Sequence, residues 1–66
     1  MDFKKAANVV REYATAHGMD VSSALADIQT KSADLSDKER LAWSIIDRLV
    51  TGSGNSVADI FETIPE

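Results

Sequence analysis

The segment from Ser36 to Gly52, SDKERLAWSIIDRLVTG, constrains the fold more than any other part of the chain. Ser36 and Glu39 have the spacing of a capping box, in which the serine hydroxyl accepts from the glutamate N–H and the carboxylate accepts from the serine N–H. Asp37 and Glu39 also place negative charge at the positive end of the helix dipole. Gly52 is the residue type that commonly ends a helix in the left-handed conformation. We therefore expect a helix over residues 37–51.

The apolar side of this predicted helix is wide. At about 100° per residue its apolar side chains spread over roughly 200° of the circumference. These side chains are Leu41, Ala42, Trp43, Ile45, Ile46, Leu49 and Val50. A helix on the surface of a domain usually needs an apolar stripe of little more than about 100°. The pattern predicts that this is the central helix, covered from two or three sides.

Three further helices are predicted from capping residues and from apolar residues that recur three and four positions apart. Asp2 and Gly18 bound the first helix. The second begins at Asp20 or Ser22. The last follows a flexible Gly-Ser-Gly-Asn-Ser loop and is too short to be stable without docking on the others. The expected helices span about 3–17, 21–32, 37–51 and 57–64, and no segment alternates as a strand would. The predicted fold is all-α, a single domain over residues 1–66 that forms a small compact bundle of three helices plus a short C-terminal fourth.

Length and composition limit how such a domain is stabilised. A chain of 66 residues allows one domain and buries only about 60% of the surface that its unfolded form exposes. The sequence has no cysteine and one histidine, so we expect neither disulfides nor a structural metal site. Domains of this size often gain stability by association. A homodimer or a partner protein is therefore expected, unless the well-capped helices suffice alone.

The start of the chain and its hydropathy predict a cytoplasmic protein. The first residues, Met-Asp-Phe-Lys-Lys, open a mixed helix and not the apolar run of a signal peptide. No apolar run approaches the roughly 18 residues that a membrane span needs. Small acidic proteins of this kind are common in bacteria and their phages, and we expect such a source.

No set of residues has the parts of an enzyme. His17 lies in the last turn of the first helix, on its apolar side, where helix capping or packing explains it. A general base needs a nucleophile or a carboxylate partner, and the sequence identifies none for it. The loop at residues 52–56 precedes a helix, but it follows a helix instead of a strand and contains no lysine, unlike a phosphate-binding loop. We therefore expect no catalytic residue, no metal, no cofactor and no small-molecule substrate.

The leading functional hypothesis is a small protein-interaction module that acts as a regulator or inhibitor. The net charge of −4 disfavours generic nucleic-acid binding and suits a basic partner surface. Trp43 lies at the edge of the wide apolar arc, where it is either the largest side chain of the core or an interface anchor. The predicted partner-binding residues are Trp43, Asp47, Val50, Glu39 and Arg40.

Two alternative functions stay open. The second and third helices could form a helix-turn-helix in which Lys31, Lys38 and Arg40 approach DNA phosphates. The third helix begins with alternating acidic and basic residues, and the turn before it lacks glycine, so this alternative is disfavoured. The other alternative is a structural subunit of a larger assembly, in which the last helix exchanges onto a neighbouring chain.

Overall fold

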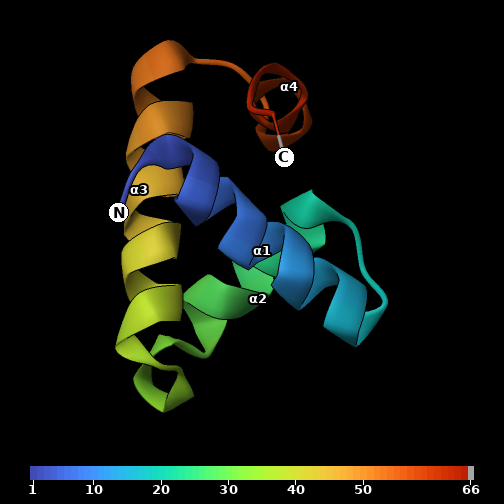
Figure 1. Cartoon of the computed structure of the whole chain (residues 1–66), viewed down its shortest axis with the longest axis vertical. Helices are drawn as coiled ribbons and strands as arrows, with labels where there is room; N and C mark the ends of the chain where they lie inside the picture. Colours follow the sequence, from blue (N-terminus) through green and yellow to red (C-terminus); the bar gives the residue numbers. More distant parts are fainter. Residues whose placement is uncertain (66) are drawn as a thin grey trace.

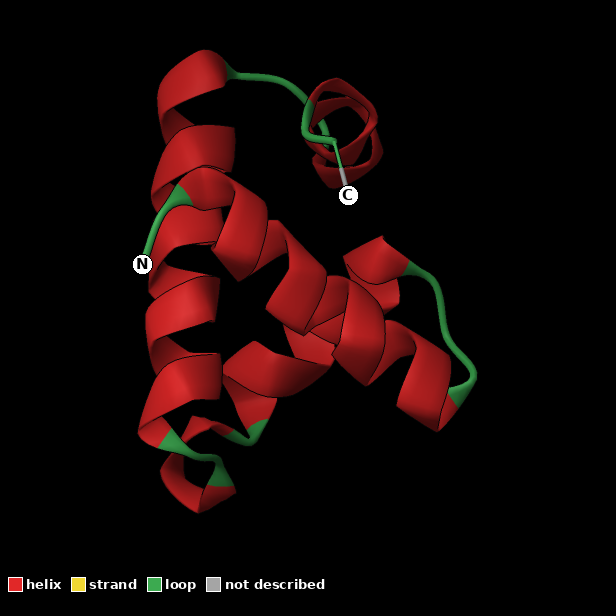
Figure 2. Cartoon of the chain, in the orientation of Figure 1, coloured by secondary structure: helices red, strands yellow, loops and turns green. Residues whose placement is uncertain are grey.

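A computed structural model describes residues 1–65, apart from the side chain of Ser32, and these residues form four α-helices and no strand (Figures 1 and 2). The long α3 is crossed by α1, while α4 is seen almost along its own axis in Figure 1. The all-α bundle predicted from the sequence is confirmed. Its elements are α1 (Phe3–His17), α2 (Val21–Thr30), the 3₁₀ turn η1 (Ser32–Asp34), α3 (Asp37–Ser53) and α4 (Val57–Thr63).

Each α-helix begins at a side-chain cap. The carboxylates of Asp2 and Asp20 accept backbone N–H groups three residues further on, at 2.8 and 2.7 Å. The hydroxyls of Ser36 and Ser56 do the same, at 3.3 and 3.2 Å. The Glu39 carboxylate accepts from the Ser36 hydroxyl at 2.9 Å, where the sequence predicted a bond from the backbone N–H. These caps satisfy donors that the first turn of a helix otherwise leaves free, which is why the helix starts were predictable.

The ends of α2 and α3 each differ by two residues from the sequence prediction, and α4 ends at Thr63, one residue before its predicted end. Helix α3 continues through Gly52 to Ser53 and ends at Gly54, which adopts the left-handed conformation with φ 73°. The N–H of Gly54 donates to the carbonyl of Val50 at 3.1 Å. Either glycine can adopt this conformation, so residue type alone could not select the later one. Helix α2 ends at Thr30, before the residues of η1 that the prediction had partly assigned to it.

Helix α3 was predicted to be the central helix, but α2 as well as α3 contacts all three other helices, and the most deeply buried helix is α1. Helix α1 contributes six buried side chains, whereas α3 contributes only Ala42 and Ile46. The apolar arc of α3 is thus covered at its middle and left partly open at its edges. Its remaining apolar side chains are half-buried, except for the exposed Leu41.

Arg11 fastens α4 to α1. Its guanidinium donates to the backbone carbonyls of Phe61 at 2.8 Å, Pro65 at 3.3 Å and Ile64. It also lies over the Phe61 ring, 5.3 Å from the ring centroid. These carbonyls belong to the helix end, which has no partners of its own for them. The apolar face of α4 is buried, as predicted, and α4 docks on its own chain.

A tyrosine joins α1 to α2. The buried Tyr13 donates its hydroxyl proton to the carboxylate of Asp27, and Lys31 lies 3.4 Å from the same carboxylate. The exposed His17 packs its ring against Tyr13 with the ring centroids 4.2 Å apart, in keeping with its predicted packing role. The hydrogen bond to Asp27, together with burial, raises the pKa of Tyr13 to about 12, and the same bond lowers the pKa of Asp27.

The free energy of unfolding should therefore fall at both ends of the pH scale. The pKa of Tyr13 is raised on folding, so its contribution is complete below its unfolded value of 10.0 and is lost as the pH rises through about 12. The pKa of Asp27 is lowered on folding, so its contribution is present above about 3.9 and is lost as the pH falls through the folded value. Urea unfolding across pH should give a flatter profile for Tyr13→Phe. Identical profiles for the variant and the wild type would contradict this coupling.

Candidate functional site

The face of α3 predicted to bind a partner is partly used by the core. Trp43 and Val50 are half-buried and pack against the core cluster. Glu39 and Asp47 are also half-buried, while the exposed Arg40 forms an ion pair within the first turns of α3. This face therefore offers less free apolar surface than its sequence suggested. Its role as an interface stays a prediction.

The residues named for the DNA-binding alternative do not form one basic surface. Lys38 and Arg40 are two positions apart on α3 and so project about 160° from each other. Arg40 pairs with Asp37, and Lys31 lies 3.4 Å from the Asp27 carboxylate. Two of the three cations thus already face carboxylates, and the alternative gains no support from their positions.

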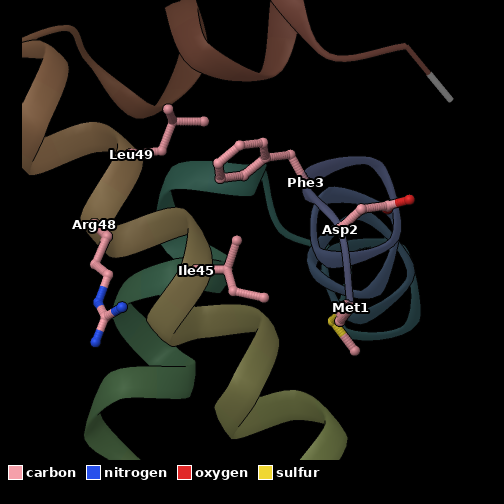
Figure 3. Close-up of a pocket in the computed structure, with 6 residues that line it drawn as sticks. All are labelled: Met1, Asp2, Phe3, Ile45, Arg48 and Leu49. Carbon is pink, nitrogen blue, oxygen red and sulfur yellow. The ribbon is translucent and has the colours of Figure 1, made fainter.

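A hollow apolar surface lies between the start of α1 and the other edge of the α3 arc (Figure 3). The Phe3 ring points toward Ile45 and Leu49 of α3, while Arg48 extends away from them. Phe3 is 53% exposed and Met1 is 47% exposed. We call this surface the Phe3 groove, and it is lined by Met1, Asp2, Phe3, Ile45, Arg48 and Leu49.

A second hollow lies next to the groove, between α1 and the first turn of α3. This adjoining hollow shares Met1 with the groove and is lined in addition by Lys5, Asn8, Val9, Glu12 and Lys38. Leu41 is 49% exposed and lies one turn before Ile45 on the same side of α3. We call Leu41, Ile45 and Leu49 the apolar strip of α3. The cations Lys5, Lys38 and Arg48 line the two hollows next to it. Within residues 1–65 none of the three forms an ion pair.

The sequence pattern groups Phe3 with the buried residues of the first helix and gives no reason to expect an exposed ring. Phe3 is the first residue of α1, so no earlier helical turn lies beside it. The available signal was the width of the α3 arc, which has two edges. Trp43 marks one edge, and Leu41 and Ile45 mark the other. The sequence prediction chose the first edge because Trp43 is aromatic. In the structure the side chains of the second edge are more exposed to solvent.

Comparison of the chain with protein-family models, with curated proteins and with solved structures finds no match. None of the helices in the described residues has the length and apolar character needed to cross a membrane. In the same part of the chain, no three His, Cys, Asp or Glu side chains are placed to share a metal ion. The function of the Phe3 groove is therefore inferred from the residues that line it.

Proposed function

We propose that the protein is a protein-interaction module that binds an amphipathic helix of a partner protein in the Phe3 groove. One observation carries the proposal: Met1, Phe3 and Leu41 remain about half exposed beside the groove. Contiguous exposed apolar side chains with a polar rim mark interaction sites on soluble domains. By covering the partner's helix the protein would act as a small regulator or inhibitor, in the cytoplasm, as its sequence predicts.

The spacing of the apolar strip supports a helical occupant. Leu41, Ile45 and Leu49 follow one another at intervals of four residues along one side of α3. A second helix lying beside such a strip can place its own residues at i, i+4 and i+7 against it. The Phe3 ring, projecting from the start of α1, forms the opposite wall of the groove.

The apolar part of the groove supplies only a modest affinity. Completing the burial of a half-exposed Phe, Leu or Met side chain stabilises a complex by about 1 kcal/mol. Three such side chains therefore contribute about 3 kcal/mol before the cost of association, whereas micromolar binding corresponds to about 8 kcal/mol. Contacts at the rim of the groove must then contribute to affinity and select the partner.

Photo-crosslinking in the cells of origin tests the proposed surface. A crosslinking amino acid in place of Leu41 should capture a discrete partner, whereas the same group in place of the exposed Gln29 of α2 should not. Adding Ile45→Asp should reduce the capture about tenfold or more, because a charge would then enter the apolar strip. The measurement is the crosslinked fraction on denaturing gels, with circular dichroism of each variant as a control for folding.

Equal capture from positions 41 and 29 would contradict the proposal, as would capture that Ile45→Asp leaves unchanged. A crosslink from position 47 in place of position 41 would instead assign the interface to the Trp43 face. That result would favour the residues predicted from the sequence.

A further inference from the structure

We infer that the helix bound in the Phe3 groove is acidic, with a carboxylate at each end of its apolar stripe. This inference rests on the proposed function and adds the chemical class of the partner. The protein itself has a net charge of −4, which taken alone favours a basic partner. The charges beside the groove have the opposite balance, and they are what a bound helix meets.

The charged α3 side chains that line the two hollows are both cations, and the exposed Asp37, which lies one turn before Leu41, already pairs with Arg40. Lys38 lies one turn before Leu41, and Arg48 lies one turn after Ile45. Both project beside the apolar strip and line its hollows. Neither forms an ion pair with a carboxylate in the described part of the chain. An incoming carboxylate can therefore reach each of them without displacing an existing partner.

The α1 side of the groove has a mixed rim in which one carboxylate is already engaged. Lys5 and Glu12 line the adjoining hollow, and Asp2 lines the groove itself. The Asp2 carboxylate accepts the backbone N–H of Lys5 at 2.8 Å as the N-cap of α1. Among the residues that line the two hollows, three cations thus face two carboxylates, and one of those carboxylates is bound within the chain.

The spacing of the α3 cations defines the partner more closely. Arg48 lies ten positions after Lys38, which corresponds to about 15 Å along a helix. A partner helix lying along α3 would meet both cations with carboxylates about ten residues apart. Its apolar residues would lie between them, against Leu41, Ile45 and Phe3. Complementary charges at a rim chiefly set specificity and the rate of association.

The same charges disfavour two of the registers in which a second copy of this chain could lie along α3. If two α3 helices paired antiparallel with Leu41 opposite Ile45 of the second copy, Lys38 would lie opposite its Arg48. If they paired parallel and in register, Lys38 would lie opposite Lys38 of the second copy. Either arrangement opposes like charges across the contact, which disfavours association.

Two synthetic peptides test the inference on the full chain. Both are about fifteen residues long and share one leucine stripe at helical spacing. They differ only in the flanking pair, placed about ten residues apart, which is glutamate in one peptide and lysine in the other. Shifts of the backbone amide signals of isotope-labelled protein locate each peptide and give its Kd. We expect the glutamate peptide to bind in the Phe3 groove about tenfold more tightly than the lysine peptide.

Charge-reversed variants distinguish the effect of the charges beside the groove from the effect of the net charge of the protein. The double variant Lys38→Glu with Arg48→Glu should reverse the order of the two affinities. The double variant Lys31→Glu with Arg40→Glu changes the net charge by the same amount at residues that do not line the groove, and circular dichroism checks its folding because both cations pair with carboxylates. This control variant should leave the order of the affinities unchanged.

Four results with the peptides would overturn the inference. These are equal affinities of the two peptides, tighter binding of the lysine peptide, reversal of the order by the control variant, and no shift at the groove with either peptide. A concentration-dependent dimer that Ile45→Asp abolishes would also overturn it, because the occupant would then be a second copy. The crosslink from position 41 uses the natural partner, so it tests the proposed function independently of these peptides.

Discussion

Replacing Ile46 with alanine should unfold a large fraction of the protein, whereas the same replacement at the neighbouring Ile45 should change its stability little. Ile46 is 0% exposed at the centre of the α3 arc. Truncating a fully buried isoleucine to alanine typically costs about 2–5 kcal/mol, because it leaves a cavity. A domain of 66 residues is stable by only about 3–10 kcal/mol. Ile45 is half-buried beside the Phe3 groove, so its truncation should cost about 1 kcal/mol or less.

Urea unfolding followed by circular dichroism measures both variants, and the half-buried Trp43 gives a second, fluorescent probe. The two isoleucines differ in this comparison only in their position on α3. Ile45→Ala should remain folded and yet weaken binding of the acidic peptide, whereas Ile46→Ala should lose stability first. Equal destabilisation of the two variants would contradict the assignment of Ile45 to an open edge.

The contrast between these neighbouring residues shows what the sequence could predict. Ile46 lies at the middle of the apolar arc, so any neighbour that covers α3 buries it. The helix starts were also predictable, because Asp2, Asp20, Ser36 and Ser56 act on backbone groups within their own first turn. Both kinds of inference depend on local periodicity and local hydrogen bonds. They hold without knowledge of how the helices cross.

The position of the candidate site, in contrast, depends on where α1 crosses α3. Leu41 and Trp43 lie at opposite edges of the arc, about 200° apart across it, and the sequence treats the two edges alike. Where α1 crosses α3 decides which edge remains open, and that position arises from the packing of all four helices. The half-exposure of Phe3 follows from the same crossing, because its ring lies at the start of α1 and points toward Ile45 and Leu49 of α3. A helical wheel contains no information about this geometry.

Arg11 shows the same limit for a polar residue. Its position on the polar half of the first helix is typical of a solvated side chain. In the structure it donates to the carbonyl of Phe61, 50 residues away in the chain. Nothing near Arg11 in the sequence indicates this contact. The pairing follows from the docking of α4, which brings the free carbonyls of a helix end beside α1.

Replacing Arg11 with alanine should release α4 from the bundle. The guanidinium serves the carbonyls of Phe61, Ile64 and Pro65, and hydrogen bonds to a charged donor contribute about 1.5–3 kcal/mol each without being additive. Helix α4 has only seven residues and is marginal on its own. We expect a loss of about 2–4 kcal/mol, seen first as rapid hydrogen exchange of the α4 amides. Arg11→Lys should lie in between, because an ammonium lacks the planar fork that reaches several acceptors.

The matched control is Arg48→Ala, which removes an exposed arginine that makes no ion pair within residues 1–65. Its effect on stability should stay within about 0.5 kcal/mol. Release of α4 would uncover the buried Ile60 and Phe61, which a second chain could then cover. Sedimentation of Arg11→Ala over a range of concentrations therefore tests the exchange of the last helix between chains. Slow exchange of the α4 amides in Arg11→Ala would contradict the fastening role, because burial of the α4 apolar face would then suffice to hold the helix.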